Sequence, residues 1–321
     1  MAQILQPTPA HLDQLAAVLS QGEIVAIPTE TVYGLAGNAL NPEAVAKIYE
    51  AKGRPARNPL IVHIGHSDQI GEIAFLPDVG SELIDHFWPG PLTLVLPKTK
   101  AVPDSVTAGL DSVAVRMPAH PVFQKLASRC SFPLAAPSAN PFGYVSPTKA
   151  EHVESQMGDV LEWILDGGTC RRGIESTILS LIDPDNPEIL RHGSISVDRL
   201  STFLGQQILE KNRVDEGKGL ISPGLMKRHC SPKTTVQLFE GPPPALDSNS
   251  AIVFLGKASK EFANPFSLST DGNLEAVART LYDTLHQLDK KGFQSIYLEL
   301  PPASGLGLAI RDRMKRAASK G

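Results

Sequence analysis

Short apolar runs alternate with stretches of helical periodicity through the first two hundred residues, and this alternation most constrains the fold. The apolar runs have the length and the flanking Gly, Pro or polar turns of strands, at 23–28, 59–64, 92–97, 112–117, 133–137, 160–166, 174–182 and 188–191. Apolar residues at helical spacing predict helices at 9–20, 43–51, 79–87, 121–129, 149–157 and 196–206. The pattern predicts an α/β domain with a twisted, mixed, open sheet flanked by helices.

A second, smaller domain is expected, because 321 residues exceed one ordinary domain. Residues 209–232 lose periodicity and gain Gly, Pro and charge, which is typical of an interdomain linker. The order β-β-α-β-α follows, with strands at 234–239, 251–255 and 295–300 and helices at 273–290 and 306–318. We therefore expect domains at 1–208 and 233–321, the second a small parallel α/β (Rossmann-like) domain.

Composition favours a soluble globular protein of the cytoplasm. Hydrophobic residues make up 42% and charged residues 20% of the chain. The apolar runs are shorter than the ~18 residues that span a bilayer, so no membrane association is expected. The N-terminus shows no basic region followed by an apolar core, which argues against a secretory signal. Cys130, Cys170 and Cys230 lack CxxC spacing, which argues against disulfides or zinc and fits a reducing compartment.

The net charge of −4 is unevenly distributed. Residues 1–208 hold 14 Lys and Arg against 22 Asp and Glu, whereas residues 209–321 hold 16 against 12. The first region therefore lacks the overall basic character of a nucleic-acid-binding domain, and any phosphate site there must be a local cluster. The basic C-terminal segment predicts one solvated helix face, with contact to tRNA as the alternative; its cations are Arg311, Arg313, Lys315, Arg316 and Lys320.

Residues 28–63 combine hydroxyl groups, a helix and closely spaced cations. Lys52 and Arg54 follow the helix directly, and Gly53 and Pro55 prevent that helix from continuing. The spacing predicts that both cations lie on an irregular, solvent-facing loop. Cations beside strand ends suit a polyanion such as a nucleotide triphosphate, although a plain solvated loop is the alternative.

Polar residues also stand at the ends of three other expected strands. Arg116 lies near the end of an apolar strand, where it must pair with the carboxylate of a neighbour or of a ligand. Ser138 and Asn140 follow another strand, and could also be plain turn residues. Ser176 and Thr177 begin a further strand with two hydroxyl groups.

Together these segments resemble the threonylcarbamoyl-AMP synthase family in its long form, which has an extra C-terminal domain. The resemblance rests on PTETVYGL at 28–35, Lys-x-Arg at 52 and 54, Ser-x-Asn at 138 and 140, and Ser-Pro-Gly at 222–224. It covers essentially the whole chain and makes 1–208 the catalytic domain. It implies a nucleotidyltransferase that condenses L-threonine, bicarbonate or CO2, and ATP to threonylcarbamoyl-AMP and pyrophosphate. The product serves N6-threonylcarbamoyladenosine modification of tRNA, through a downstream transferase machinery.

The resemblance also implies a role for individual residues. Lys52 and Arg54 would be catalytic. ATP would be bound by Lys52, Arg54, Asn58, Ser112, Ser138, Asn140, Ser146 and Arg191. L-Threonine would be bound by Thr31, His63, Arg116, Ala136 and Ser176. Mg2+ would be held mainly by the ATP phosphates, because the sequence shows no all-protein metal cage.

The linker at 209–232 is expected to close over the site, since a carbamate intermediate is unstable in water. Many family members carry His-Tyr-Ala-Pro there, whereas this chain has His229, Cys230, Ser231 and Pro232. A tyrosine contact from the linker is therefore not expected, and His229 is either a lid residue or an ordinary surface histidine.

Three other functions remain open from the sequence. The first is a double-stranded-RNA-binding module, which the acidic first region opposes. The second is another carbamoyl or adenylyl transferase of the same fold, such as the related domain of hydrogenase-maturation carbamoyltransferases, which the Ser-Pro-Gly linker opposes. The third is a structural protein with a decayed site, which the joint presence of Lys52, Arg54, Ser138 and Asn140 opposes.

Overall fold

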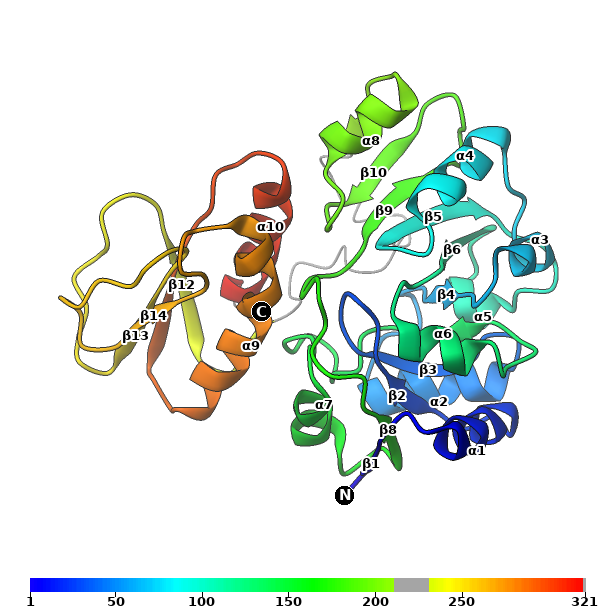
Figure 1. Ribbon diagram of the computed structural model, residues 1–321, viewed down its shortest axis with the longest axis horizontal. Helices are drawn as coiled ribbons and strands as arrows, with labels where there is room; N and C mark the ends of the chain where they lie inside the picture. The colour runs from blue at the N-terminus through cyan, green and yellow to red at the C-terminus, as the bar shows by residue number, and fades with distance from the viewer. Residues whose placement is uncertain (211–230, 320–321) are drawn as a thin grey trace.

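The computed structural model describes residues 1–210 and 231–319, which form a large and a small α/β unit, each built on its own sheet (Figure 1). The expected lid, with His229 and Cys230, lies almost entirely outside the described residues. The expected fold class, a mixed-sheet domain followed by a small parallel one, is confirmed.

The large sheet has eleven strands in the order β1-β8-β2-β3-β7-β4-β6-β5-β9-β10-β11. It is mixed: β4 runs parallel to β6, for example, whereas β7 runs antiparallel to β4. The strands are β1 (Gln3–Leu5), β2 (Val25–Ile27), β3 (Gly34–Asn38), β4 (Ile61–His63), β5 (Leu92–Pro97), β6 (Ser112–Arg116), β7 (Leu134–Ala135), β8 (Trp163–Leu165), β9 (Thr177–Ser180), β10 (Glu188–Arg191) and β11 (Leu209–Glu210).

Helices cover both faces of this sheet, because alternate strand residues point to opposite faces. In β2, Val25 and Ile27 pack with α1 and α6, whereas Ala26 belongs to the core on the α2 side. Proline starts α1, α2 and α6, and each is capped by the preceding side chain. The helices are α1 (Pro9–Ser20), α2 (Pro42–Lys52), the short 3-10 helix η1 (Ser67–Gln69), α3 (Ile70–Ile73), α4 (Asp78–Phe87), α5 (Asp104–Thr107), α6 (Pro121–Ala127), α7 (Ala150–Met157) and α8 (Val197–Leu204).

The small unit has a four-stranded sheet in the order β12-β15-β13-β14, and all its strand pairs are parallel. Figure 1 shows α9 and α10 between this sheet and the large unit. The apolar core of the small unit continues into the large one, because it includes Val32, Val145 and Ile174. The elements are β12 (Thr235–Phe239), β13 (Ser250–Phe254), β14 (Pro265–Ser267), α9 (Leu274–Lys290), β15 (Ser295–Glu299) and α10 (Leu306–Ala318).

The structure contains four strands that the sequence pattern did not predict, β1, β3, β11 and β14. Leu209–Glu210 pairs with β10, so the sheet continues two residues beyond the expected first domain. None of the helices in the described segments combines the length and apolar character that a bilayer crossing requires.

Candidate functional site

The candidate site is a cavity that opens where several strands of the large sheet end. His63 and Arg116 are neighbours at the carboxyl ends of the parallel strands β4 and β6. Arg191 ends β10, and Ser176 directly precedes β9. The cavity is lined by Thr29, Thr31, Val32, Gly34, Arg54, Ile61, His63, Arg116, Ala136, Pro137, Ser138, Glu175, Ser176 and Arg191.

The structure brings together most of the residues expected from the sequence. Those that line the cavity are Thr31, Arg54, His63, Arg116, Ala136, Ser138, Ser176 and Arg191. Among the described residues, the lining does not include Lys52, Asn58, Ser112, Asn140 or Ser146. Ser112 begins β6, whereas Arg116 ends it, so the two lie about 13 Å apart along the strand.

The expected solvent-facing position of Lys52 and Arg54 is wrong. Lys52 is the last residue of α2 and is only 3% exposed. It lies on the same buried face of α2 as Ala44 and Ile48, four and eight residues earlier. Gly53 then ends the helix in the left-handed conformation, with φ 59°, and turns the chain toward Arg54. Arg54 is buried as well, and donates from Nε to the carbonyl oxygen of Asn58 and from Nη2 to that of Pro59.

Lys52 does not line the cavity but supports a turn that does. Its Nζ donates to the backbone carbonyl oxygens of Ser138 and Asn140. The Asn140 side chain fastens the same turn, because Nδ2 donates to the carbonyl oxygens of Pro141 at 2.8 Å and Tyr144 at 3.0 Å. Lys52 and Asn140 therefore hold the Ser138–Asn140 turn in place beside the cavity.

Arg116 is paired with a carboxylate of a neighbour, one of the two alternatives that the sequence left open. Its Nη2 lies 2.6 Å from Oε1 of Glu30. Its Nη1 donates to Oγ1 of Thr31 at 2.9 Å, and its Nε to the carbonyl oxygen of Gly90 at 3.1 Å. All three partner groups belong to loops outside the strands, so Arg116 is held in one orientation at the cavity.

Arg191 and Ser176 form the part of the wall beside β9 and β10. Arg191 donates from Nε to the carbonyl oxygen of Ser176 at 3.1 Å and from Nη2 to its Oγ at 3.0 Å. The Ser176 hydroxyl also shares a 2.7 Å hydrogen bond with Oγ1 of Thr93. This side of the cavity therefore presents a cation and a hydroxyl group that are fixed to each other.

The cavity is strongly electropositive. Burial lowers the pKa of Arg54 to about 10. Burial, followed by the charge of Arg313, lowers the pKa of Arg191 to about 9. Burial, followed by the charge of Arg116, lowers the pKa of His63 to about 3, so its imidazole is neutral at neutral pH. Three arginines in one cavity repel one another, and a bound polyanion would offset that repulsion.

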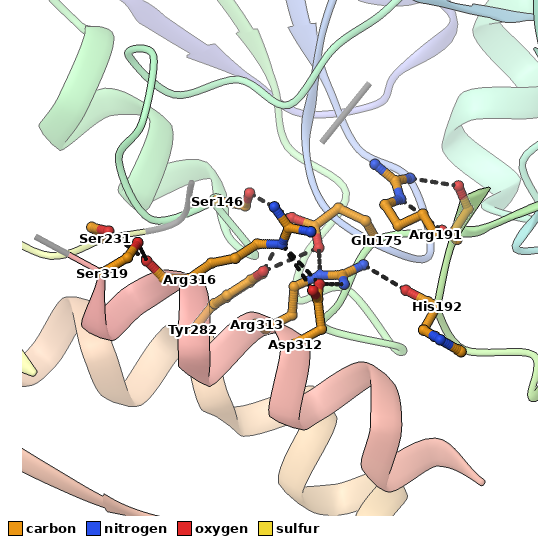
Figure 2. Close-up of polar contacts among 11 residues, drawn as sticks. Ser146, Glu175, Arg191, His192, Ser231, Tyr282, Asp312, Arg313, Arg316 and Ser319 are labelled. Atoms are coloured by element: carbon orange, nitrogen blue, oxygen red, sulfur yellow. Dashed lines mark hydrogen bonds and ion pairs between the residues drawn. The ribbon is translucent and has the colours of Figure 1, made fainter. Parts of the chain in front are cut away.

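Glu175 is the cavity residue that the sequence reasoning missed. Its carboxylate receives hydrogen bonds from Arg313 at 2.6 Å, Tyr282 at 3.0 Å and Ser146 at 2.8 Å (Figure 2). The sequence did contain a signal for Glu175, because a carboxylate within the strand expected at 174–182 must pair with a cation if it is buried. The partner is Arg313, whose expected position on a solvated helix face is wrong, since it is 2% exposed.

The cavity residues do not fit a protein-held Mg2+. Among the described residues, no group of three or more His, Cys, Asp and Glu side chains could hold a metal ion. Glu175, the carboxylate of the cavity lining, is already paired with Arg313, and Glu30, which lies beside the cavity, is paired with Arg116. Hard cations prefer several oxygen ligands, which this arginine-rich set does not supply.

A second, larger cleft lies between the large and small units. Its basic lining residues are the exposed Arg171, Arg172, Arg199 and Arg279. Glu30 lines this cleft, and its partner Arg116 lines the first cavity, so the two spaces meet at this ion pair.

The chain is similar to known proteins over nearly its full length. Residues 17–193 match the family described as "Telomere recombination", and residues 195–319 match "Threonylcarbamoyl-AMP synthase, C-terminal domain". The chain is 41% identical to threonylcarbamoyl-AMP synthase of Bacillus subtilis (strain 168), over 96% of this chain and 93% of the relative. It is 39% identical to that of Pyrococcus abyssi, over 94% of this chain and 92% of the relative. The crystal structure of P. abyssi Sua5 complexed with L-threonine superposes with a TM-score of 0.89 at 36% identity, over 99% of this chain and 98% of that one.

Proposed function

The chain belongs to the threonylcarbamoyl-AMP synthase family, and from this premise we propose that it condenses L-threonine, bicarbonate or CO2, and ATP to threonylcarbamoyl-AMP and pyrophosphate. It is a nucleotidyltransferase, and its product serves N6-threonylcarbamoyladenosine modification of tRNA. The family expected from the sequence is confirmed.

The observation that carries this function is the convergence of Arg54, Arg116 and Arg191 on one cavity. The reaction must bring a carboxylate, a carbamate and a triphosphate together, although their negative charges repel. Guanidinium groups bind carboxylate and phosphate oxygens with two hydrogen bonds at once, so three of them can offset this repulsion.

The chemistry requires no nucleophile from the protein. The amine nitrogen of L-threonine bonds to the carbon of CO2 and loses a proton, which gives a carbamate. A carbamate oxygen then bonds to the α-phosphorus of ATP, while the bond from that phosphorus to the bridging oxygen of pyrophosphate breaks. Holding two reactants in line can contribute about 7–11 kcal/mol to lowering the barrier, so positioning and charge neutralisation are the expected sources of rate.

For ATP, we assign the phosphates to Arg54 and Arg191, with Ser138 beside the nucleotide. Their place in the cavity lining supports this assignment. Lys52, Asn58 and Asn140 would act at the rear of the same wall, since Lys52 and Asn140 fasten its turn and the Asn58 carbonyl holds Arg54. Ser146 bonds Glu175. Ser112 lies at the other end of β6 from Arg116 and does not line the cavity, so we do not assign it to ATP.

For L-threonine, we assign the carboxylate to Arg116, whose orientation is fixed by Glu30 and Thr31. The hydroxyls of Thr31 and Ser176, the neutral imidazole of His63 and the backbone at Ala136 would surround the rest of the amino acid. A neutral His63 can accept or donate a hydrogen bond without adding a charge to the cavity.

We further propose that Mg2+ enters with ATP, carried by its phosphates, and that the protein works in the cytoplasm, where its tRNA-modifying partners act. The charge of Mg2+ would reduce the repulsion between the phosphates and the carbamate.

The test is pyrophosphate release from ATP, measured with and without L-threonine and bicarbonate. Release that requires both supports the synthase. Release without threonine would point to another carbamoyl or adenylyl transfer, and no release at all would overturn the proposal.

For contact with tRNA, the second cleft offers the specific observation, because it gathers four exposed arginines, three from the acidic large unit and Arg279 from α9 of the small unit. We propose that these arginines meet RNA phosphates. Binding of a tRNA transcript should then weaken about 10-fold or more between 50 and 200 mM salt. The variant Arg171→Glu/Arg172→Glu should reduce both the affinity and this salt dependence; unchanged binding would contradict the proposal.

A further inference from the structure

The small unit reaches into the wall of the proposed active site. We propose that Arg313 and Tyr282 are positioning residues, which act through Glu175 to hold Ser176 and Arg191 ready for the substrates. The inference rests on the proposed function and gives the small unit a part in catalysis.

The contact that carries this inference is a buried ionic cluster between the two units (Figure 2). Arg313 of α10 donates from Nε to Oε2 of Glu175 at 2.6 Å. The hydroxyl of Tyr282 of α9 lies 3.1 and 3.0 Å from the two carboxylate oxygens. Arg313, Tyr282 and Glu175 are all buried, so solvent does not screen this cluster as it screens a surface ion pair.

Arg313 holds the ends of two strands at once. While its Nε binds Glu175, its Nη2 donates to the carbonyl oxygen of His192 at 2.9 Å. Glu175 directly precedes Ser176, and His192 directly follows Arg191. One guanidinium group of the small unit therefore fixes both neighbours of the Ser176–Arg191 wall.

The two strand ends are packed too tightly to move independently. A Cβ atom at Gly193 would lie 2.2 Å from the backbone nitrogen of Thr177 and 2.3 Å from the carbonyl carbon of Ser176. Such distances are far shorter than ordinary carbon contacts, so only glycine fits there. A displacement of Glu175 would therefore be passed to Ser176 and Arg191.

The charge of Arg313 also suits a cavity that binds anions. A carboxylate in the wall repels phosphates unless a cation neutralises it, and Arg313 supplies that cation. Burial by itself lowers the pKa of Arg313, but the carboxylates of Glu175 and Asp312 outweigh burial and raise it, so the guanidinium stays charged. Without Arg313, the Glu175 carboxylate would compete with the substrates for Arg191.

The alternative is that Arg313 only docks the two units. Two matched controls separate docking from positioning. Lys149 of the large unit pairs with Asp283 of α9 at 2.9 Å, an interdomain contact among residues that do not line the cavity. Arg311, on the same helix as Arg313, pairs with Glu240 inside the small unit at 3.1 Å.

The experiment measures threonine-dependent pyrophosphate release, L-threonine and ATP binding by calorimetry, and the melting temperature, all on the full chain. Arg313→Met should lower kcat/KM about 10-fold or more, since it removes the guanidinium that binds the buried Glu175 carboxylate. Tyr282→Phe, which removes one hydroxyl, should lower it about 3-fold. Lys149→Met and Arg311→Met should leave kcat/KM within about 2-fold of wild type.

A double-mutant cycle tests whether Arg313 acts through Glu175. In a Glu175→Gln background, Arg313→Met should lower kcat/KM by less than about 3-fold, because the side chain through which Arg313 acts is already neutral. If the loss of kcat/KM in the double variant equalled the product of the losses in the two single variants, the inference would be overturned. An Arg313→Met protein that matched Lys149→Met in kcat/KM at equal melting temperature would also overturn it.

Failure of the proposed function would look different. A wild-type chain that released no pyrophosphate would overturn the synthase, and ligand binding would then decide the positioning role by itself. If Arg313→Met bound ATP and L-threonine as tightly as wild type, the positioning role of Arg313 would be overturned, whether or not the wild-type chain released pyrophosphate. If Arg313→Met did not fold, Tyr282→Phe and Arg313→Lys would give the same comparison, with Arg313→Lys expected between wild type and Arg313→Met.

Discussion

At the residue scale, the site consists of cations whose positions are fixed by neighbouring groups before any substrate arrives. Arg116 is held by Glu30 and Thr31, and Arg191 by Ser176. Fixed donors lose little entropy when they bind a ligand, which favours tight and specific recognition of anions. The consequence is that most changes to these cations should affect both binding and stability.

Arg116→Ala should weaken L-threonine binding and destabilise the fold, because it removes the proposed carboxylate partner and leaves Glu30 buried and unpaired. Breaking a buried ion pair on one side costs about 3–5 kcal/mol. Calorimetry would measure threonine affinity, and urea unfolding the stability. The double variant Glu30→Gln/Arg116→Met should recover stability but not threonine binding; recovery of both would remove Arg116 from the threonine site.

Lys52→Met should abolish turnover and lower the free energy of unfolding by about 1–3 kcal/mol, because one buried and one partly buried carbonyl oxygen lose their donor. Lys47 is the control, since it lies in the same helix but pairs with Glu23 at the surface. Lys47→Met should change stability by less than about 0.5 kcal/mol. Urea unfolding of both variants checks this, and equal stabilities would contradict the structural role of Lys52.

At the element scale, long periodic segments were predicted well and short strands less so. Helix α1 and strands β5 and β10 have the expected bounds. Strand β3 was missed because Gly34–Asn38 reads GLAGN, without β-branched or aromatic residues, and only its neighbours β2 and β7 make it a strand. Its small residues also leave room for the cavity, which Gly34 lines.

One loop shows how backbone conformation brings the units together. Gly173 has a φ of 73°, and a Cβ atom there would lie 2.4 Å from Cα of Arg279 on α9. Gly173→Ala should therefore disturb domain docking as well as strain the loop. Gly205 is the control, since its φ is 66° but nothing lies within 4 Å of the same atom.

Gly205→Ala should cost only the left-handed strain, about 1–2 kcal/mol, and the cost of Gly173→Ala should be clearly larger. Thermal unfolding monitors the stability, and limited proteolysis the docking of the units. Equal costs at the two positions would show that the close approach of Gly173 to α9 contributes nothing to docking.

At the scale of the whole molecule, two histidines join the units. His152 of α7 and His286 of α9 stack with their ring centroids 4.0 Å apart, beside Asp283 and Lys149. Burial, followed by the neighbouring His286, lowers the pKa of His152 to about 3. Burial lowers the pKa of His286 to about 4. Both rings are therefore neutral in the folded protein at neutral pH.

This pair predicts a loss of stability in acid. Both histidines bind protons more readily when unfolded, near their ordinary pKa of about 6.5. Their contribution is therefore fully present above pH 6.5 and is lost as the pH falls from 6.5 toward 4 and 3. Urea unfolding at pH 7.5 and 5.0 measures the loss. His152→Gln/His286→Gln should show a smaller loss than wild type, and an equal loss would contradict the prediction.

The sequence by itself determined the alternation of elements, the family and most of the residues that line the cavity, because periodicity and short motifs are local and strand ends gather at one edge of a sheet. Only the tertiary structure decided how those residues are held. The inward turn of Lys52 depends on carbonyl oxygens 86 and 88 residues away. The pairing of Glu175 with Arg313 spans 138 residues. Burial and charge pairing arise from such distant contacts, and no local pattern records which partner will neutralise a buried charge.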